Sequence, residues 1–154
     1  LVHALPKRRE DRAVFAHGDA LSLPLSSDCA DACTVAFGLR NTADRIVGLR
    51  EMARVVRPGG WVLVLEFTTP PGKIFGSLYT SYFTKLLPRV GKLISKDDAA
   101  YRYLPDTVLA WPKAPALRDE MASIGLLDCD FRYLTRGIAS LHWGRVPAAQ
   151  ESER

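Results

Sequence analysis

The spacing of apolar residues predicts a strand followed by a helix in the first half of the chain. Residues 30–39, ADACTVAFGL, form a near-continuous apolar run, which is typical of a parallel strand covered on both faces. Residues 41–44, NTAD, offer capping side chains for a helix that runs to about Val56. The apolar residues of this helix recur at spacings of three and four: Ile46, Leu49, Met52, Ala53 and Val56.

A second strand completes this unit. The sequence RPGG at 57–60 ends the helix with a turn that needs a positive φ, and WVLVLEF at 61–67 is another buried strand. A short strand, Val14–Ala16, is expected before Gly18. Strands and helices that alternate with short connections predict an α/β fold with a doubly wound, mostly parallel sheet.

The pattern changes after this unit. Residues 68–72, TTPPG, form a rigid loop, and residues 73–96 place their large apolar side chains on one helical stripe. A second helical segment, 97–112, closes at Pro112. We therefore expect 68–112 to be a helical insertion that serves as a lid over a substrate.

The end of the chain returns to regular elements. Residues 113–125 predict an amphipathic helix, and 126–135 and 137–146 predict two strands joined by a tight Thr-Arg-Gly turn. This gives a terminal antiparallel pair. We expect one domain over residues 1–147 and a disordered tail over 148–154.

Composition narrows the class of protein. The chain has 154 residues, is 47% hydrophobic and carries a formal charge of +4, without a run of like charges that would indicate nucleic-acid binding. Its apolar runs are too short to span a membrane, and residues 1–11 lack the pattern of a signal peptide. Cys29, Cys33 and Cys129 are expected to be reduced, small core residues of a cytoplasmic protein. No metal site is expected.

Three strand ends are expected at the same edge of the sheet. Asp19 and Ala20 follow the first strand, 36–38 follow the second and 66–67 the third, and ligands of such sheets bind at the carboxyl ends of the strands. The Asp19 carboxylate can accept a hydrogen bond from an adenine amino group, or it can cap a turn. The sequence at 57–60 belongs to the opposite edge.

Several short motifs occur together in a specific order. GDALSLPL, FGLRN, EMARVVRPGG and VLVLEF resemble the second half of a class I S-adenosylmethionine-dependent methyltransferase. Four further motifs narrow the resemblance to the demethylmenaquinone/ubiquinone C-methyltransferase family: LEF followed by a proline-bearing loop, LLPRVGKLIS, YRYL and GIASLHWG. The resemblance extends from about Gly18 to Arg145. The resemblance implies methyl transfer from S-adenosylmethionine to a ring carbon of a reduced polyprenyl quinone, most readily demethylmenaquinol to menaquinol. It also implies a Rossmann-like sheet whose last strand is antiparallel.

The resemblance also implies where the cofactor binds. Asp19 and Ala20 are expected beside the adenine and Ala36 beside the cofactor, although family members often have serine at this last position. The family's glycine-rich cofactor loop and the acidic residue that holds the ribose have no counterpart in this sequence. We therefore expect a fragment whose N-terminal strands lie outside the chain; a degenerate copy is the alternative.

Arg40 and Asn41 are the candidate catalytic residues, and similarity to the family points to the same pair. Ionising a quinol hydroxyl raises electron density at the ring carbons, so the site needs a base or a cation. A guanidinium keeps its proton at physiological pH, so Arg40 is expected to hold a water that takes the proton and to stabilise the oxyanion. Asn41 would orient that water or the second oxygen. Alternatively, Arg40 is a solvated surface residue and Asn41 a helix cap.

The other candidate residues also have structural explanations. Tyr101, Tyr103 and Phe37 are candidate substrate contacts, although the two tyrosines can equally be packing residues. His142, in an alternating strand, is expected to be structural rather than a base. Asp97 and Asp98 are explained as well by a helix N-terminus as by a role near the site.

Residues 73–96 carry Lys73, Lys85, Arg89, Lys92 and Lys96 with no acid. A basic amphipathic helix of this kind can lie on the inner face of a membrane, where a polyprenyl substrate resides, or it can be a lid that packs on the domain or in a homodimer. Two other functions stay open: a non-catalytic partner subunit, and a methyltransferase of another phenolic molecule. A nicotinamide-dependent oxidoreductase is disfavoured because the sequence has no GxGxxG.

Overall fold

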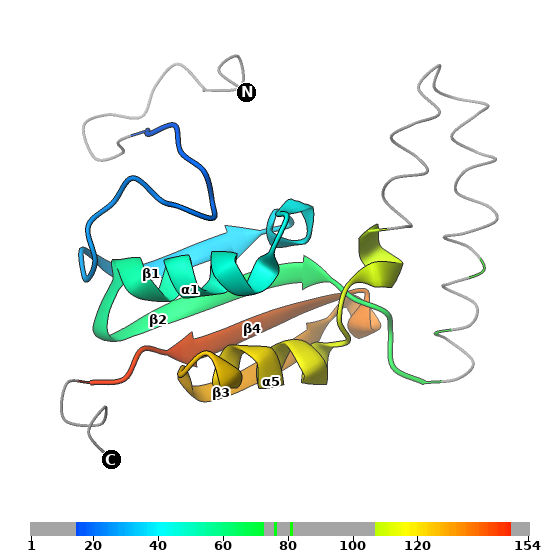
Figure 1. Cartoon of the computed structure of the whole chain (residues 1–154). Coiled ribbons are helices and arrows are strands. Elements are labelled where there is room, and N and C mark those ends of the chain that lie inside the picture. Colours follow the sequence, from blue (N-terminus) through cyan, green and yellow to red (C-terminus); the bar gives the residue numbers. More distant parts are fainter. Residues whose placement is uncertain (1–14, 73–75, 77–80, 82–106, 149–154) are drawn as a thin grey trace, which may run out of the picture.

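The computed structural model describes residues 15–72, 76, 81 and 107–148, and its strands form one four-stranded sheet in the order β1-β2-β4-β3 (Figure 1). The strands are β1 Ala30–Ala36, β2 Val56–Phe67, β3 Leu127–Leu134 and β4 Ala139–Arg145. β1 and β2 are parallel, whereas β4 is antiparallel to both β2 and β3. The predicted strand–helix–strand unit and the terminal antiparallel pair are confirmed.

Two α-helices cover one face of this sheet. α1, Arg45–Val55, lies over β1 and β2, and α5, Ala114–Ser123, lies over β3 and β4 (Figure 1). The Arg45 Nε donates to Glu120 Oε2 at 2.8 Å and thereby joins the two helices. Short 3-10 helices, η2 Leu39–Asn41 and η4 Thr135–Gly137, follow β1 and β3.

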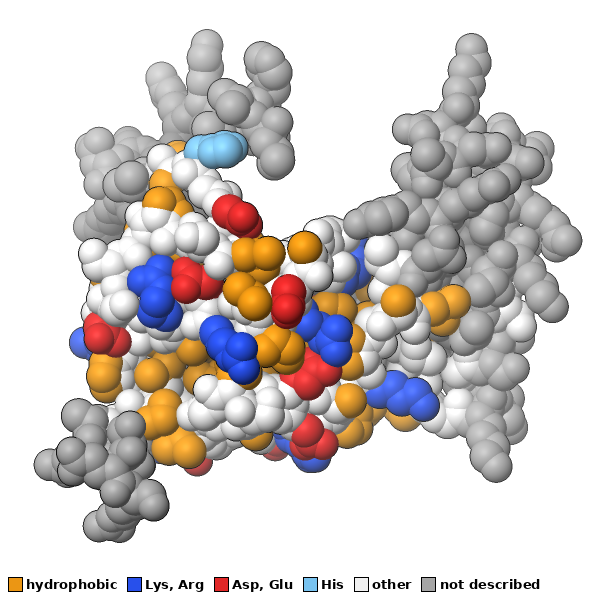
Figure 2. All heavy atoms as spheres, viewed as in Figure 1, with side chains coloured by type: hydrophobic (Ala, Val, Ile, Leu, Met, Phe, Trp, Pro, Cys, Tyr) orange, Lys and Arg blue, Asp and Glu red, His pale blue; other side chains and the backbone are white. Residues whose placement is uncertain are grey.

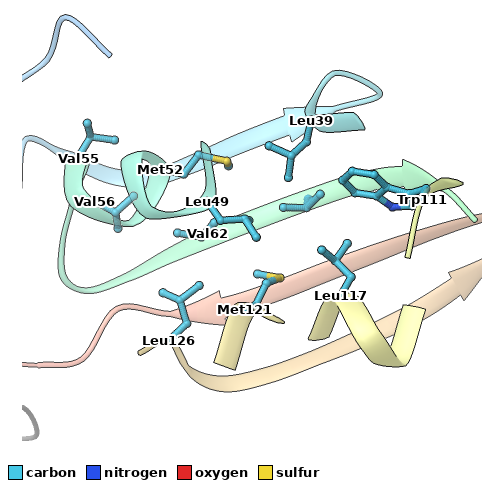
Figure 3. Close-up of a cluster of buried hydrophobic side chains, with 11 residues drawn as sticks. Leu39, Leu49, Met52, Val55, Val56, Val62, Trp111, Leu117, Met121 and Leu126 are labelled. Atoms are coloured by element: carbon cyan, nitrogen blue, oxygen red, sulfur yellow. The ribbon is translucent and has the colours of Figure 1, made fainter. Parts of the chain in front are cut away.

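The hydrophobic core fills the space between the helices and the sheet (Figure 3). Leu49 and Met52 reach it from α1, and Leu117 and Met121 reach it from α5. Burying one such side chain contributes roughly 1.5–3 kcal/mol. The remaining members of the core are Leu39, Val55, Val56, Val62, Val64, Trp111 and Leu126.

The outer surface of the helical layer mixes charges of both signs. In Figure 2, acidic and basic side chains lie next to one another over α1 and α5 rather than forming a patch of one sign. Arg45 pairs with Glu120 and Arg54 with Glu51, all partly exposed. Such pairs are surface features of the fold and contribute little to its stability.

α1 begins where its capping residue predicts. The Asp44 side chain accepts hydrogen bonds from the backbone N–H groups of Ile46 at 2.8 Å and Val47 at 3.1 Å. This satisfies two donors that have no partner inside the helix. The helix ends at Val55, one residue before the predicted end.

The sequence RPGG at 57–60 lies within β2, which begins at Val56, five residues earlier than predicted. The register to β1 shifts here, because Ala30 faces Val56 whereas Ala32 faces Trp61. Gly59 has the predicted positive φ, 81°. Between these two pairs, the segment bonds to the residue that follows β4: Val146 N donates to Gly60 O and Gly59 N donates to Val146 O, both at 2.9 Å.

The predicted strand at Val14–Ala16 is wrong for the part that the structure describes. Phe15 and Ala16 belong to no strand, and Phe15 is 71% exposed. A strand requires a partner for its backbone groups. Neither residue pairs with a strand among the described residues, so the local pattern does not become a strand.

The expectation that residues 30–39 are covered on both faces is also wrong in the described structure. Cys33 and Val35 pack towards the core, but Ala32, Thr34 and Ala36 are exposed. β1 is at the edge of the described sheet, and α1 covers one of its faces. Successive side chains of a strand point to opposite faces, so covering one face buries alternate residues.

The three cysteines differ in burial. Cys33 and Cys129 are half-buried, and burial raises the pKa of both thiols. Cys29 is exposed, which corrects its assignment to the core. It precedes β1 in a loop, where its backbone N–H bonds to Val55 O at 2.9 Å while the side chain lies outside the packed face.

Several predictions fall on residues that the structure does not describe. Most of the helical lid at 68–112, including the basic segment 73–96 with Asp97 and Asp98, lies outside the described residues, as does the tail from 149 onwards. In the part of the chain that is described, no helix is long and apolar enough to cross a membrane.

Candidate functional site

The carboxyl ends of β1 and β2 meet at one edge of the sheet, as the sequence predicts. Phe37 N donates to Leu65 O at 2.9 Å, and the rings of Phe37 and Phe67 are 4.5 Å apart between centroids. Phe37 has a positive φ of 55° and is 38% exposed. A non-glycine residue in this conformation marks a tight, locally strained turn, and here it leaves an aromatic ring accessible.

Arg40 lies at this turn and forms a buried ion pair with Glu66. Its Nη1 is 2.8 Å from Glu66 Oε2, and the side chains are 9% and 0% exposed. The same Nη1 donates to Phe37 O at 2.7 Å, and the guanidinium lies 5.5 Å from the Phe67 ring centroid. The alternative that Arg40 is a solvated surface residue is therefore wrong.

One buried N–H group of the guanidinium, that of Nε, has no acceptor among the described residues. A buried donor without an acceptor is costly, so a water or a substrate oxygen that reached it would be favoured. The role of Arg40 in holding a water or an oxyanion stays a prediction.

Asn41 follows at the end of η2 and is exposed. Its backbone N–H donates to Gly38 O at 3.1 Å. The cap of α1 is Asp44, so the alternative that Asn41 caps that helix is wrong. Its exposed amide is placed one residue after Arg40, and its catalytic role stays a prediction.

The loop that carries Asp19 and Ala20 lies beside α1. Asp19 Oδ1 accepts from Leu21 N at 2.9 Å, which is the turn-capping contact that the sequence left as an alternative to adenine binding. A methyl group built at Gly48 of α1 would lie 3.0 Å from Leu39 Cδ1, so the glycine allows Leu39 to pack closely on the helix, and 3.7 Å from Leu21 Cδ2, an ordinary contact that places the loop against α1. The loop is therefore positioned by the helix.

An apolar cavity of about 240 Å³ opens next to this loop. Ala20 lines it with Val35 of β1, with Gly38 in the turn after β1 and with Met52 of α1. Its apolar walls suit a flat aromatic ring such as adenine. Ala36 is exposed and, one residue after Val35, points to the opposite face of β1, so the structure does not bring it into this cavity.

Two charged residues of α1 hold the 21–27 loop, and sequence reasoning missed both. Glu51 Oε2 accepts from Leu23 N at 3.0 Å, and Arg54 Nη2 donates to Leu23 O at 3.2 Å. Arg54 Nη1 also donates to Leu25 O at 2.9 Å. An i, i+3 pair on an exposed helix face looks like an ordinary solvated pair, so nothing in the sequence marks its partners.

Of the remaining candidate residues, the structure describes His142 but not the two tyrosines. Tyr101 and Tyr103 lie outside the described residues. His142 is fully buried, with its Nε2 2.9 Å from Ala114 O and its ring stacked on Phe131, and burial lowers its pKa. It packs between β4 and α5, away from the strand ends, so the structural interpretation is confirmed.

The family follows from the sequence over nearly the whole chain. A model of the ubiE/COQ5 methyltransferase family matches residues 6–146. The chain belongs to this family. The resemblance drawn from the short motifs is thereby confirmed.

The chain is similar to curated demethylmenaquinone methyltransferases. It is 45% identical over 130 residues to the demethylmenaquinone methyltransferase of Mycolicibacterium paratuberculosis, which covers 84% of this chain and 56% of that protein. It is 44% identical over 130 residues to the protein of the same name from Corynebacterium kroppenstedtii, with 84% and 57% covered. The chain thus spans little more than half the length of the curated relatives that it matches.

Solved structures agree on the fold. Human N-acetylserotonin methyltransferase in complex with S-adenosylmethionine aligns with a TM-score of 0.59 at 21% identity, over 92% of this chain and 36% of that one. A methyltransferase from Thermotoga maritima aligns with a TM-score of 0.55 at 15% identity, over 84% and 62%. The fold is that of the class I S-adenosylmethionine-dependent methyltransferases.

Proposed function

We propose that the chain takes part in S-adenosylmethionine-dependent C-methylation of a polyprenyl quinol, with demethylmenaquinol converted to menaquinol. The observation that carries this proposal is the 45% identity to a demethylmenaquinone methyltransferase over 84% of the chain. Because the curated relatives carry this name, the menaquinone pathway is favoured over the ubiquinone pathway.

Ala20, Asp19 and the end of β1 are the residues that would hold the cofactor. The apolar cavity beside Ala20 fits an adenine ring, and the exposed carboxylate of Asp19, the residue before Ala20, would accept a hydrogen bond from the adenine amino group. When bound, S-adenosylmethionine supplies an electrophilic methyl group. The residues that the structure describes supply no glycine-rich loop for the methionine end, so the cavity accounts for the adenine alone.

Arg40, with its unused Nε, is proposed to stabilise the ionised quinol. The hydroxyl proton of the quinol passes to a water that Arg40 and Asn41 hold, and the negative charge left on the oxygen is stabilised by the guanidinium. The neighbouring ring carbon gains electron density. Phe37 and Phe67, 4.5 Å apart and adjacent to Arg40, offer aromatic surface to the quinol ring, and Tyr101 and Tyr103 are proposed to complete it.

Peripheral membrane contact is a further part of this proposal. It is supported by the five basic residues and the apolar stripe of residues 73–96 in the sequence, and by the long apolar tail of the proposed substrate. Sedimentation with vesicles that contain anionic lipid is expected to remove the protein from solution, whereas neutral vesicles leave it there. Alternatively, the apolar stripe of residues 73–96 contacts a second copy of the chain in a homodimer. Sedimentation equilibrium without vesicles distinguishes a homodimer from a monomer that binds the membrane.

The test begins with cofactor binding. S-adenosylmethionine is titrated calorimetrically into the 154-residue chain and into the whole gene product in which this sequence occurs. Both are then supplied with demethylmenaquinol and methyl-labelled cofactor, and the product is identified by mass. We expect the whole gene product to bind the cofactor and to add one methyl group to the ring.

Two results would contradict the proposal. Cofactor binding without methylation of demethylmenaquinol would favour a methyltransferase of another phenolic molecule. Absence of cofactor binding in the whole gene product would favour a non-catalytic partner subunit. An Arg40→Met variant tests the mechanism: at a temperature where it stays folded, it should bind the cofactor as the wild type does while its kcat falls about 100-fold or more.

A further inference from the structure

Glu66 is a fully buried carboxylate near the end of β2, directly after the apolar residues 61–65. In the other ion pairs between described residues, both side chains are at least 18% exposed. Burying a carboxylate is costly, so a fully buried one requires a compensating cation. Arg40 is that cation, 26 residues earlier in the chain.

The carboxylate contacts both the side chain and the backbone of the turn that carries Arg40. Its Oε2 accepts from Arg40 Nη1 at 2.8 Å and from Phe67 N at 3.3 Å, and its Oε1 accepts from Arg40 N at 3.3 Å. β2 is paired on both sides, to β1 and β4, and is therefore a rigid support. Arg40 itself lies in a three-residue 3-10 helix, which alone would not fix its orientation.

We propose that Glu66 is a positioning residue for the methyl transfer, which holds the Arg40 guanidinium in place and balances its charge at the carboxyl end of β2. This inference rests on the proposed function. It assigns Glu66 no contact with the quinol: the carboxylate acts through Arg40. Because the pair is neutral as a whole, the guanidinium can stabilise a developing quinolate without holding an anion permanently in the resting site.

The charge balance has a consequence that a merely structural carboxylate would not have. Replacing Glu66 by glutamine removes the negative charge and leaves the Arg40 cation uncompensated. An uncompensated cation favours the ionised form of a nearby hydroxyl. The ascending limb of the pH profile of kcat, which reports ionisation of the bound quinol, should then move to lower pH by roughly one to two units.

The experiment measures kcat and KM for demethylmenaquinol between about pH 6 and pH 10 in the whole gene product. Glu66→Gln is expected to shift the ascending limb to lower pH and to reduce the plateau kcat roughly 10- to 100-fold, since Arg40 loses its anchor. Glu66→Asp keeps the charge but shortens the side chain, so it should reduce kcat with the limb unmoved. Glu120→Gln, which breaks the Arg45 pair on the helical layer, is the matched control and should change neither.

Each outcome bears on one proposal or the other. A wild type that does not methylate demethylmenaquinol overturns the proposed function and the role of Glu66 with it. An active wild type whose limb stays at the same pH in Glu66→Gln overturns the role of Glu66 alone. Should Glu66→Gln fail to fold, Glu66→Asp decides the question, because full wild-type kcat in that variant would exclude a positioning role.

Discussion

Removing the Arg40 side chain tests how much the buried ion pair contributes to the fold. In an Arg40→Met variant, Glu66 loses its hydrogen bond of 2.8 Å and keeps two longer contacts of 3.3 Å to the backbone N–H groups of Arg40 and Phe67. The carboxylate is fully buried, so water cannot replace the guanidinium. Breaking one partner of a buried pair typically costs about 3–5 kcal/mol, and we expect a decrease of this size in the free energy of unfolding.

The double variant Arg40→Met with Glu66→Met tests whether the loss of stability in the single variant comes from the unpaired charge of Glu66. Replacing both charged groups by apolar side chains of similar volume removes the unpaired charge, so most of the lost free energy should return. Urea unfolding followed by circular dichroism measures both variants. A loss of less than about 1 kcal/mol in the single variant, or a double variant that is as unstable as the single one, would contradict this expectation. Activity should stay low in both, because neither has the guanidinium.

Three further predictions concern other parts of the molecule. Burial lowers the pKa of His142, so the unfolded chain binds a proton at this residue more readily than the folded chain does. The contribution of His142 to the free energy of unfolding should be fully present above about pH 6.5 and decrease by up to about 1.4 kcal/mol per pH unit below it. Urea unfolding at a series of pH values should show this decrease in the wild type and a smaller one in His142→Gln. Leu117→Ala empties a fully buried site and should cost about 2–5 kcal/mol in the same assay, whereas Leu109→Ala, at a 39% exposed position, should change little. Arg54→Met releases the carbonyls of the 21–27 loop and should weaken calorimetric binding of S-adenosylmethionine several-fold with little change in Tm; unchanged affinity would separate this loop from the cofactor site.

The amino-acid sequence determined the regular elements and their order. Apolar spacing of three and four gave α1 to within one residue of its end, and Asp44 was within the predicted capping segment. The alternation in 126–146 gave the terminal antiparallel pair and its turn at Thr135–Gly137. These features depend on residues close together in the chain, where hydrogen bonding and side-chain period are local.

The tertiary structure decided how the candidate site is arranged. Arg40 was predicted as a functional residue. Its ion pair with Glu66 depends on the register in which β1 pairs with β2, and this register cannot be predicted from a local sequence pattern. The sequence did hold one indication, a carboxylate at the end of the apolar run WVLVLEF. The same register exposed alternate residues of β1 and left Ala36 outside the apolar cavity. Contacts between residues far apart in the chain depend on how strands and helices pack, so sequence spacing predicts which elements form but not which side chains meet.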